Sequence, residues 1–149
     1  MSLEALLRYW SSQKLSKTPG VSEQEIEAFE KRYKIRIYDE FRHYLSTVNG
    51  MVEADNCDSN LFAFWSLEKI KPVADECPEL EGAKGHESYF VFADYMIWSW
   101  AYAINLDANS SDAGEVILIG GLRPQRVARS FFDFIGLYVQ DSKDLYASA

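Results

Sequence analysis

Sulfur and imidazole ligands are scarce in this sequence. Its 149 residues include only two cysteines, Cys57 and Cys77, and two histidines, His43 and His86. The cysteines stand twenty positions apart, which is no zinc-binding spacing, and neither histidine has a His or Cys partner at ligand spacing. We therefore predict reduced thiols, no metal and no cofactor. A chain of this length fits one domain and can bury enough surface to fold without a disulfide or metal.

Long apolar runs are missing as well. The most apolar stretch, residues 89–106, is interrupted by Asp94, Ser99 and Asn105. It therefore falls short of the ~18 uninterrupted apolar residues expected of a membrane-spanning helix. The first residues lack the basic region, apolar core and cleavage site of a secretory signal. We predict no membrane partner and a cytoplasmic location, where thiols stay reduced.

Positive charge is in short supply. Lysine and arginine number 15 against 23 aspartates and glutamates, so the net charge is −8. Nucleic-acid binding needs clustered basic residues that displace counterions, so we predict no nucleic-acid partner. An acidic surface would instead steer a basic protein toward it. Solubility alone also explains such a charge, and the composition does not separate the two.

Local motifs for catalysis are absent. There is no Gly-x-Ser-x-Gly elbow and no glycine-rich phosphate loop followed by lysine. The acidic loops that start at Asp55 and Asp107 lack the glycine and the last glutamate of an EF-hand. A nucleophile site or a carboxylate pair assembled only in three dimensions leaves no local pattern, and the sequence leaves those open. We predict that the chain is not an enzyme.

Helical signals occupy the first third of the chain. An apolar i, i+3, i+4, i+7 spacing predicts a helix over residues 3–13. Ser22 and Glu25 form a capping box at the start of a second helix, which runs to Tyr33. A third helix is predicted from near Asp39 to residue 48, and the Asn-Gly pair at 49–50 ends it.

Strand signals follow, and one more helix closes the chain. Short apolar and aromatic runs predict strands over 61–65, 89–93, 96–104 and 116–119. The run 96–104 alternates large and small residues, so Trp98 and Trp100 are interpreted as core, although they would be binding anchors if exposed. Helical spacing predicts the last helix from Arg126 to Tyr138. Because the strands are grouped together, we predict the α+β class.

The order of these signals resembles the SUKH superfamily, which includes the Smi/Knr-type cell-wall assembly regulators of yeast and many bacterial immunity proteins. The matching segments, in chain order, are the capped helix 22–33, Ile37-Tyr38, Tyr44-Leu45, Asn49-Gly50, Trp65-Ser66-Leu67 with Ile70, Phe92-Ala93-Asp94 and the run 130–135. One position departs from the family pattern: Tyr38 stands where the family usually has proline, and Asp39 is expected to cap the helix instead.

This resemblance implies a SUKH-like α+β fold, with a mixed, mainly antiparallel sheet packed by N-terminal helices and a C-terminal helix. It covers a core of about residues 21–141 within a single domain 1–149, preceded by the short helix 3–13. It implies binding, not catalysis. The expected role is an immunity protein that neutralises a cognate toxin, such as a nuclease. The alternatives are a regulatory scaffold of the cell-wall-regulator type and, less favoured, a small-molecule-binding domain.

Acidic residues gather in two predicted loops, and these are the candidate contact residues for a basic protein partner. A charge desolvated in such an interface contributes strongly to binding, whereas a charge at the rim mainly speeds association. The candidate partner-binding residues are Glu53, Asp55, Asp58, Asp75, Glu76, Glu79 and Glu81.

Overall fold

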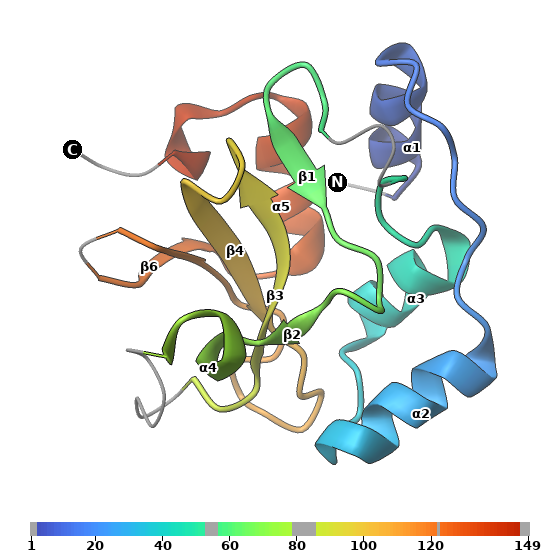
Figure 1. The fold of residues 1–149 in the computed structure, drawn as a ribbon, viewed down its shortest axis with the longest axis vertical. Coiled ribbons are helices and arrows are strands. Elements are labelled where there is room, and N and C mark those ends of the chain that lie inside the picture. The colour runs from blue at the N-terminus through green and yellow to red at the C-terminus, as the bar shows by residue number, and fades with distance from the viewer. Residues whose placement is uncertain (1–2, 53–56, 79–85, 122, 147–149) are drawn as a thin grey trace.

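The computed structural model describes residues 3–52, 57–78, 86–121 and 123–146 (Figure 1). Within these ranges the chain forms five α-helices, one 3-10 turn and a six-stranded sheet. The helices are α1 (Leu3–Ser12), α2 (Glu23–Tyr33), α3 (Asp39–Thr47), α4 (Val73–Glu76) and α5 (Phe131–Val139), followed by the 3-10 turn η3 (Lys143–Leu145). The strands are β1 (Phe62–Phe64), β2 (Lys71–Pro72), β3 (Tyr89–Tyr95), β4 (Trp100–Asn105), β5 (Val116–Ile119) and β6 (Gln125–Ala128).

The sheet has the strand order β1-β3-β4-β5-β6, and β2 pairs with the same edge of β3 as β1 does. All described strand pairs are antiparallel. In Figure 1 the helices α1, α3 and α2 follow one another from top to bottom along one side of this sheet. The predicted α+β class, with N-terminal helices and a C-terminal helix packed on a sheet, is confirmed. Among the described helices, none has the length and apolar character needed to span a bilayer.

Aromatic rings form the centre of the core, as the composition indicates. Phe92 of β3 packs edge-on against Phe41 of α3 and against Phe131 and Phe134 of α5. Tilted and edge-on ring pairs of this kind are favoured over face-to-face stacking. The rings therefore fix how α3 and α5 sit on the strands.

The first helix docks on the body of the molecule. Leu3, Leu6 and Trp10 are buried, which accounts for the apolar spacing of this segment. The Trp10 indole packs edge-on against Phe64 at 5.2 Å, and its Nε1–H donates to the Tyr138 hydroxyl at 2.9 Å. Helix α1 is therefore part of the same core as β1 and α5.

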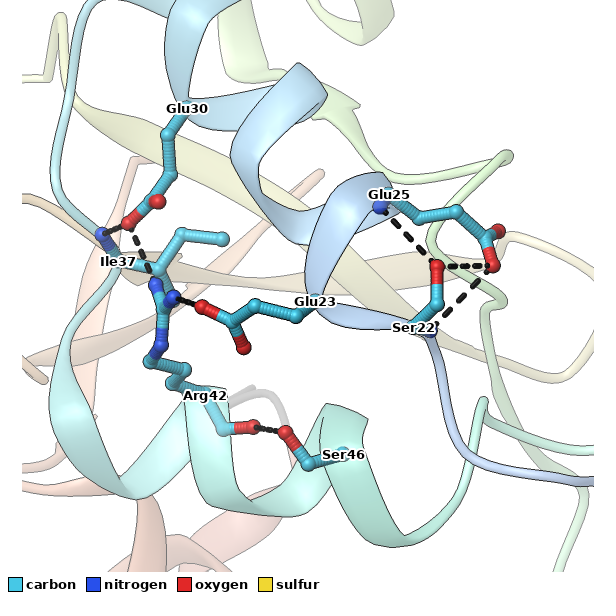
Figure 2. A network of polar contacts seen from close by, with 7 residues as sticks. All are labelled: Ser22, Glu23, Glu25, Glu30, Ile37, Arg42 and Ser46. Carbon is cyan, nitrogen blue, oxygen red and sulfur yellow. Dashed lines mark hydrogen bonds and ion pairs between the residues drawn. The ribbon is translucent and has the colours of Figure 1, made fainter.

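Helices α2 and α3 are joined by the polar network in Figure 2. The predicted capping box is present: the Ser22 hydroxyl accepts from the Glu25 amide, and the Glu25 carboxylate accepts from the Ser22 amide. Arg42 of α3 pairs with both Glu23 and Glu30 of α2. The Glu30 carboxylate also accepts a hydrogen bond from the Ile37 amide at 2.8 Å. The network thus fixes both helices and the segment between them.

The two ends of α3 are set by backbone geometry. Tyr38 takes the N-cap position without a side-chain cap bond, so the prediction that Asp39 caps the helix is wrong. The Tyr38 amide instead donates to the Leu106 carbonyl, which ties this point of the chain to the sheet. After the helix, Gly50 has φ +68°, and a Cβ there would lie 2.5 Å from the Trp65 carbonyl oxygen. Helix α3 ends earlier, at Thr47 with the extended C-cap Val48, so the predicted left-handed stop at Asn49-Gly50 is wrong, and Gly50 instead permits the close approach to Trp65.

Two other predicted boundaries are wrong. Residues 96–99 form the turn between β3 and β4, so the strand predicted over 96–104 begins only at Trp100. The helix predicted from Arg126 begins at Phe131, because residues 125–128 pair with β5 as strand β6. The Ser130 hydroxyl accepts from the Asp133 amide and caps the helix at its actual start.

Candidate functional site

A groove of about 600 Å³ opens beside the β3–β4 hairpin. Its walls come from the segment after α3, strand β1, the turn after β1 and the hairpin itself. Its lining residues include Val52, Cys57, Trp65, Glu68, Lys69 and Trp98. Leu61, Asp94 and Ile97 line it as well.

A buried carboxylate organises the groove. Asp94 of β3 is only 7% exposed, and its Oδ2 accepts from the Trp65 indole Nε1–H at 2.6 Å. Its Oδ1 accepts from the Trp98 amide at 3.3 Å. The β1–β3 register, with Ala63 opposite Asp94, brings Trp65 alongside this carboxylate. Buried charges are retained where such bonds satisfy them, so Asp94 holds the two tryptophan segments together.

The hairpin tip, defined as residues 96–99, has an unusual backbone. Met96, Ile97 and Trp98 have φ angles of 52°, 52° and 63°. This left-handed conformation costs roughly 1–2 kcal/mol for a residue with a side chain, and a β-branched residue such as Ile97 is especially disfavoured there. The Met96 amide donates to the Leu61 carbonyl at 2.9 Å and the Ser99 amide to the Tyr95 carbonyl, which holds the turn in place.

Exposed apolar side chains gather at this tip. Leu61, Met96 and Ile97 are 40%, 45% and 90% exposed, and they are the exposed large hydrophobic residues of the described chain. We call these three residues the apolar patch. Single exposed hydrophobic residues are ordinary on protein surfaces, whereas a cluster at one place marks a contact site.

Trp98 and Trp100 hold the base of the tip. The Trp98 indole Nε1–H donates to Glu76 of α4 at 3.3 Å, and Trp100 stacks on Tyr95 with the ring centroids 4.6 Å apart. Both indoles are half-buried at the margin of the core, so their interpretation as interior core residues is only partly correct. Sequence analysis did not single out Trp65, Asp94 or Ile97 for this site.

The predicted acidic contact residues differ in how exposed they are and in whether the structure describes them. Asp75 in α4 is exposed. Glu76 is half-buried and lies 3.7 Å from the Lys71 ammonium as well as within reach of Trp98. Glu53, Asp55, Glu79 and Glu81 lie outside the described residues.

Asp58 has a different environment from the other predicted residues. It is 4% exposed, and its Oδ1 accepts from the amides of Asn60 and Phe62 at 2.8 and 3.0 Å. Its Oδ2 accepts from the Tyr138 hydroxyl, which in turn accepts from Trp10. Burial, followed by the negative charge of Asp58, raises the pKa of Tyr138. Because these bonds enclose the Asp58 carboxylate in the protein, it is not available to a partner at the surface.

Described neighbours of both acidic segments lie at or beside the groove. Val52 and Cys57, which border residues 53–56 in the sequence, both line it. From the other side, Glu76 reaches the groove through its bond to Trp98. The two segments are more than 15 residues apart in the chain, and the fold brings their described ends to one place.

The rim of the groove carries charges of both signs. Glu68 and Lys69 line it, and the Lys69 ammonium lies 4.6 Å above the Trp65 ring, a cation–π distance. Over the ranges that the structure describes, no group of three or more His, Cys, Asp or Glu side chains could hold a metal ion. The arrangement is therefore a groove of mixed apolar and polar lining, which can recognise another molecule.

Comparison with known families gives one match. The model described as SMI1 / KNR4 family (SUKH-1) matches residues 20–136. No curated protein sequence matches the chain. The matched residues include the groove, the hairpin tip and α4, whereas α1 precedes them.

Proposed function

The chain belongs to the SMI1 / KNR4 family (SUKH-1), and from this premise we propose that it is a non-catalytic protein-binding module of the immunity type. It binds a basic toxin domain in the cytoplasm and blocks that domain's activity. The contact surface is acidic and comprises Asp75 and Glu76 of α4 with Glu53, Asp55, Glu79 and Glu81.

One observation carries this proposal: described residues at the borders of the two acidic segments lie at or beside the same groove. Val52 and Cys57 line it at the borders of the first segment, and Glu76 binds the groove residue Trp98 at the border of the second. Acidic residues that were scattered over the molecule would serve solubility alone. Acidic residues brought to one face produce a local potential that steers a basic partner and selects against acidic ones.

The first experiment tests protection. The chain is co-expressed with basic toxin domains, starting with any that its gene neighbourhood encodes, and cell survival is measured together with binding of the purified proteins. We expect survival and a complex that weakens as salt is raised, because exposed charges are screened within about 8 Å at 0.15 M salt. A toxin domain that kills cells equally well in the presence of the chain, and does not bind it, would falsify the proposal.

Matched charge variants sharpen this test. One variant replaces Asp75, Glu79 and Glu81 by alanine, and the control replaces Glu4, Glu27 and Asp112, of which all three are exposed. Each variant changes the net charge from −8 to −5, so a general effect of charge would affect both equally. We expect slower association only for the first variant, because rim charges act mainly on the association rate. Asp58 stays unchanged in both, since its loss would disturb the core.

A regulatory role is the alternative that family membership also favours. In that case the partner is a protein of the same cell with no toxic activity. The gene neighbourhood separates the two roles, because an immunity gene stands beside a toxin gene and a regulator does not need to.

A further inference from the structure

We propose that the apolar patch and the adjoining groove are the centre of the interface, and that their occupant is a basic segment of the partner protein that carries a bulky apolar side chain. This inference rests on the proposed function and deepens it, because it names the chemistry that the acidic residues surround. In protein interfaces a few buried apolar contacts carry most of the binding energy, and charges at the rim contribute specificity.

Exposure is the first argument. Ile97 is 90% exposed, and Leu61 and Met96 are 40% and 45% exposed. Leu61 and Ile97 line the groove, and the Met96 amide donates to the Leu61 carbonyl beside them. Within the described residues no other large hydrophobic side chain reaches comparable exposure. Two residues of the apolar patch, Leu61 and Ile97, line the same groove as Trp98, so a partner that contacts the patch also meets the groove.

The backbone is the second argument. Three consecutive residues of the tip are left-handed, and none of them is glycine. Backbone strain of this kind persists where the surrounding structure enforces it, and it gathers at functional sites. Here the enforcing contacts are the bonds of Trp98 to Asp94 and Glu76. A tip held in one conformation loses little freedom when a partner binds, which favours affinity.

The charges around the groove indicate which kind of partner fits it. Glu68 lines the groove, and the half-buried Glu76 accepts from the groove residue Trp98, whereas the exposed Asp75 lines a neighbouring hollow beside α2. The two nearby cations are already engaged, since Lys69 lies over Trp65 and Lys71 pairs with Glu76. Among the ion pairs of the described residues, none involves Glu68 or Asp75. A segment with lysine or arginine beside its apolar residue complements this rim.

The volume fits such an occupant. At about 600 Å³ the groove holds one or two large side chains, and it lies within the ~300–1,000 Å³ typical of binding pockets. A small molecule and a second copy of this chain are the competing occupants, and the experiment distinguishes both from a basic segment.

The experiment is a selection from a random peptide library displayed on phage, with the purified full chain as bait. We expect enrichment of peptides that place Ile, Leu, Met or Phe next to Lys or Arg. Enriched peptides that are acidic, or the failure to enrich any sequence, would overturn the proposal. A single concentration-dependent dimer in sedimentation experiments, formed through Ile97, would also overturn it in favour of a second copy.

Variants of the chain then locate the binding site of an enriched peptide. Ile97→Ser is expected to weaken peptide binding at least about tenfold, whereas Ile97→Leu keeps the apolar contact and most of the affinity. Glu68→Lys is expected to weaken binding at low salt, and the exposed Glu27→Lys on α2 is its matched control. Equal affinity of the wild type and Ile97→Ser would place the peptide elsewhere and overturn the proposal. Circular dichroism of each variant checks that it is folded.

The two proposals can fail separately. The peptide selection uses no toxin, so it tests the groove whatever the natural partner is. If the chain protects cells and Ile97→Ser protects equally well, the proposed function stands and the assignment of the apolar patch is wrong. If enriched peptides bind at Ile97 and no toxin is neutralised, the surface is correct and the immunity role is wrong.

Discussion

Two buried aspartates occupy opposite kinds of surroundings in this protein. Asp58 and Asp94 are 4% and 7% exposed, and each accepts a hydrogen bond from an aromatic side chain and at least one from a backbone amide. The bonds of Asp58 reach Tyr138 and so connect the loop before β1 to α5 and α1. The bonds of Asp94 hold Trp65 and Trp98 at the margin of the groove.

The same chemistry therefore serves two purposes. Around Asp58 the partners Phe62 and Tyr138 are buried core residues, so the carboxylate stabilises the fold. Around Asp94 the neighbours continue outward into a strained tip with an exposed Ile97, so the carboxylate stabilises a surface. The burial of an acidic residue thus does not reveal its role. The role depends on whether its hydrogen-bond partners lead into the core or out to the surface. Four substitutions or conditions test this distinction, in decreasing order of expected effect.

Asp58→Ala is expected to cost about 3–4 kcal/mol of unfolding free energy, because it leaves the Tyr138 hydroxyl and the amides of Asn60 and Phe62 without their acceptor inside the core. Denaturant unfolding followed by circular dichroism measures the loss. The exposed Glu27→Ala is the control and should change stability by less than about 0.5 kcal/mol. A loss for Asp58→Ala as small as that of the control would show that the enclosed network is dispensable.

Asp94→Ala is expected to cost less, about 2 kcal/mol, because water can enter from the groove and satisfy the Trp65 and Trp98 donors. Its larger effect should fall on binding, since the tip loses the bond that fixes it. The same unfolding experiment, together with peptide affinity, separates the two effects. If Asp94→Ala were as destabilising as Asp58→Ala and left affinity unchanged, the distinction between the two aspartates would collapse.

Of the two aspartates, only Asp58 bonds to a tyrosine whose pKa is raised, so high pH distinguishes their surroundings. Burial and the charge of Asp58 raise the pKa of Tyr138 above its ordinary value of 10.0. The folded protein therefore keeps this hydroxyl neutral, and its contribution is complete below pH 10 and is lost as the pH rises further. Tyr138→Phe should reduce the alkaline decline of the unfolding free energy by about 1.4 kcal/mol per pH unit. Asp94→Ala should leave that slope unchanged, and any equal change would contradict this account.

Ile97→Gly is expected to raise the unfolding free energy by about 0.5–1 kcal/mol. Glycine removes the cost of a left-handed β-branched residue, and this gain exceeds its own entropic cost. The isoleucine side chain is 90% exposed, so little packing is lost. Thermal unfolding of Ile97→Gly and of the control Ile97→Leu measures the difference. A glycine variant less stable than the wild type would mean that the tip is not strained.

Local signals in the sequence predicted the helical part of the fold well. The capping box of Ser22 and Glu25 lies within four consecutive residues, so it can be read from neighbouring positions. The boundary of α5 was missed because apolar spacing continues through β6. The Ser130–Asp133 cap, which marks the actual start, was present in the sequence and was not used.

The candidate site was less accessible to sequence reasoning, because distant residues create it. The tip has no glycine or proline to indicate a turn, and its alternation of large and small side chains is typical of a strand. What bends it are contacts of Trp98 with Glu76, 22 residues away, and of Met96 with Leu61. Likewise, the acidic Asp58 suggested a surface, whereas its partner Tyr138, 80 residues away, puts it in the interior.

The docking of α1 has a consequence for where this family unit begins and ends. The matched residues start at 20 and stop at 136, within α5. Trp10 lies before that start and Tyr138 after that stop, yet the two side chains bond to each other and close one side of the core. A fragment trimmed to the shared family segment would lose both members of this pair. The segment that matches the family is therefore shorter at both ends than the segment that forms the closed core.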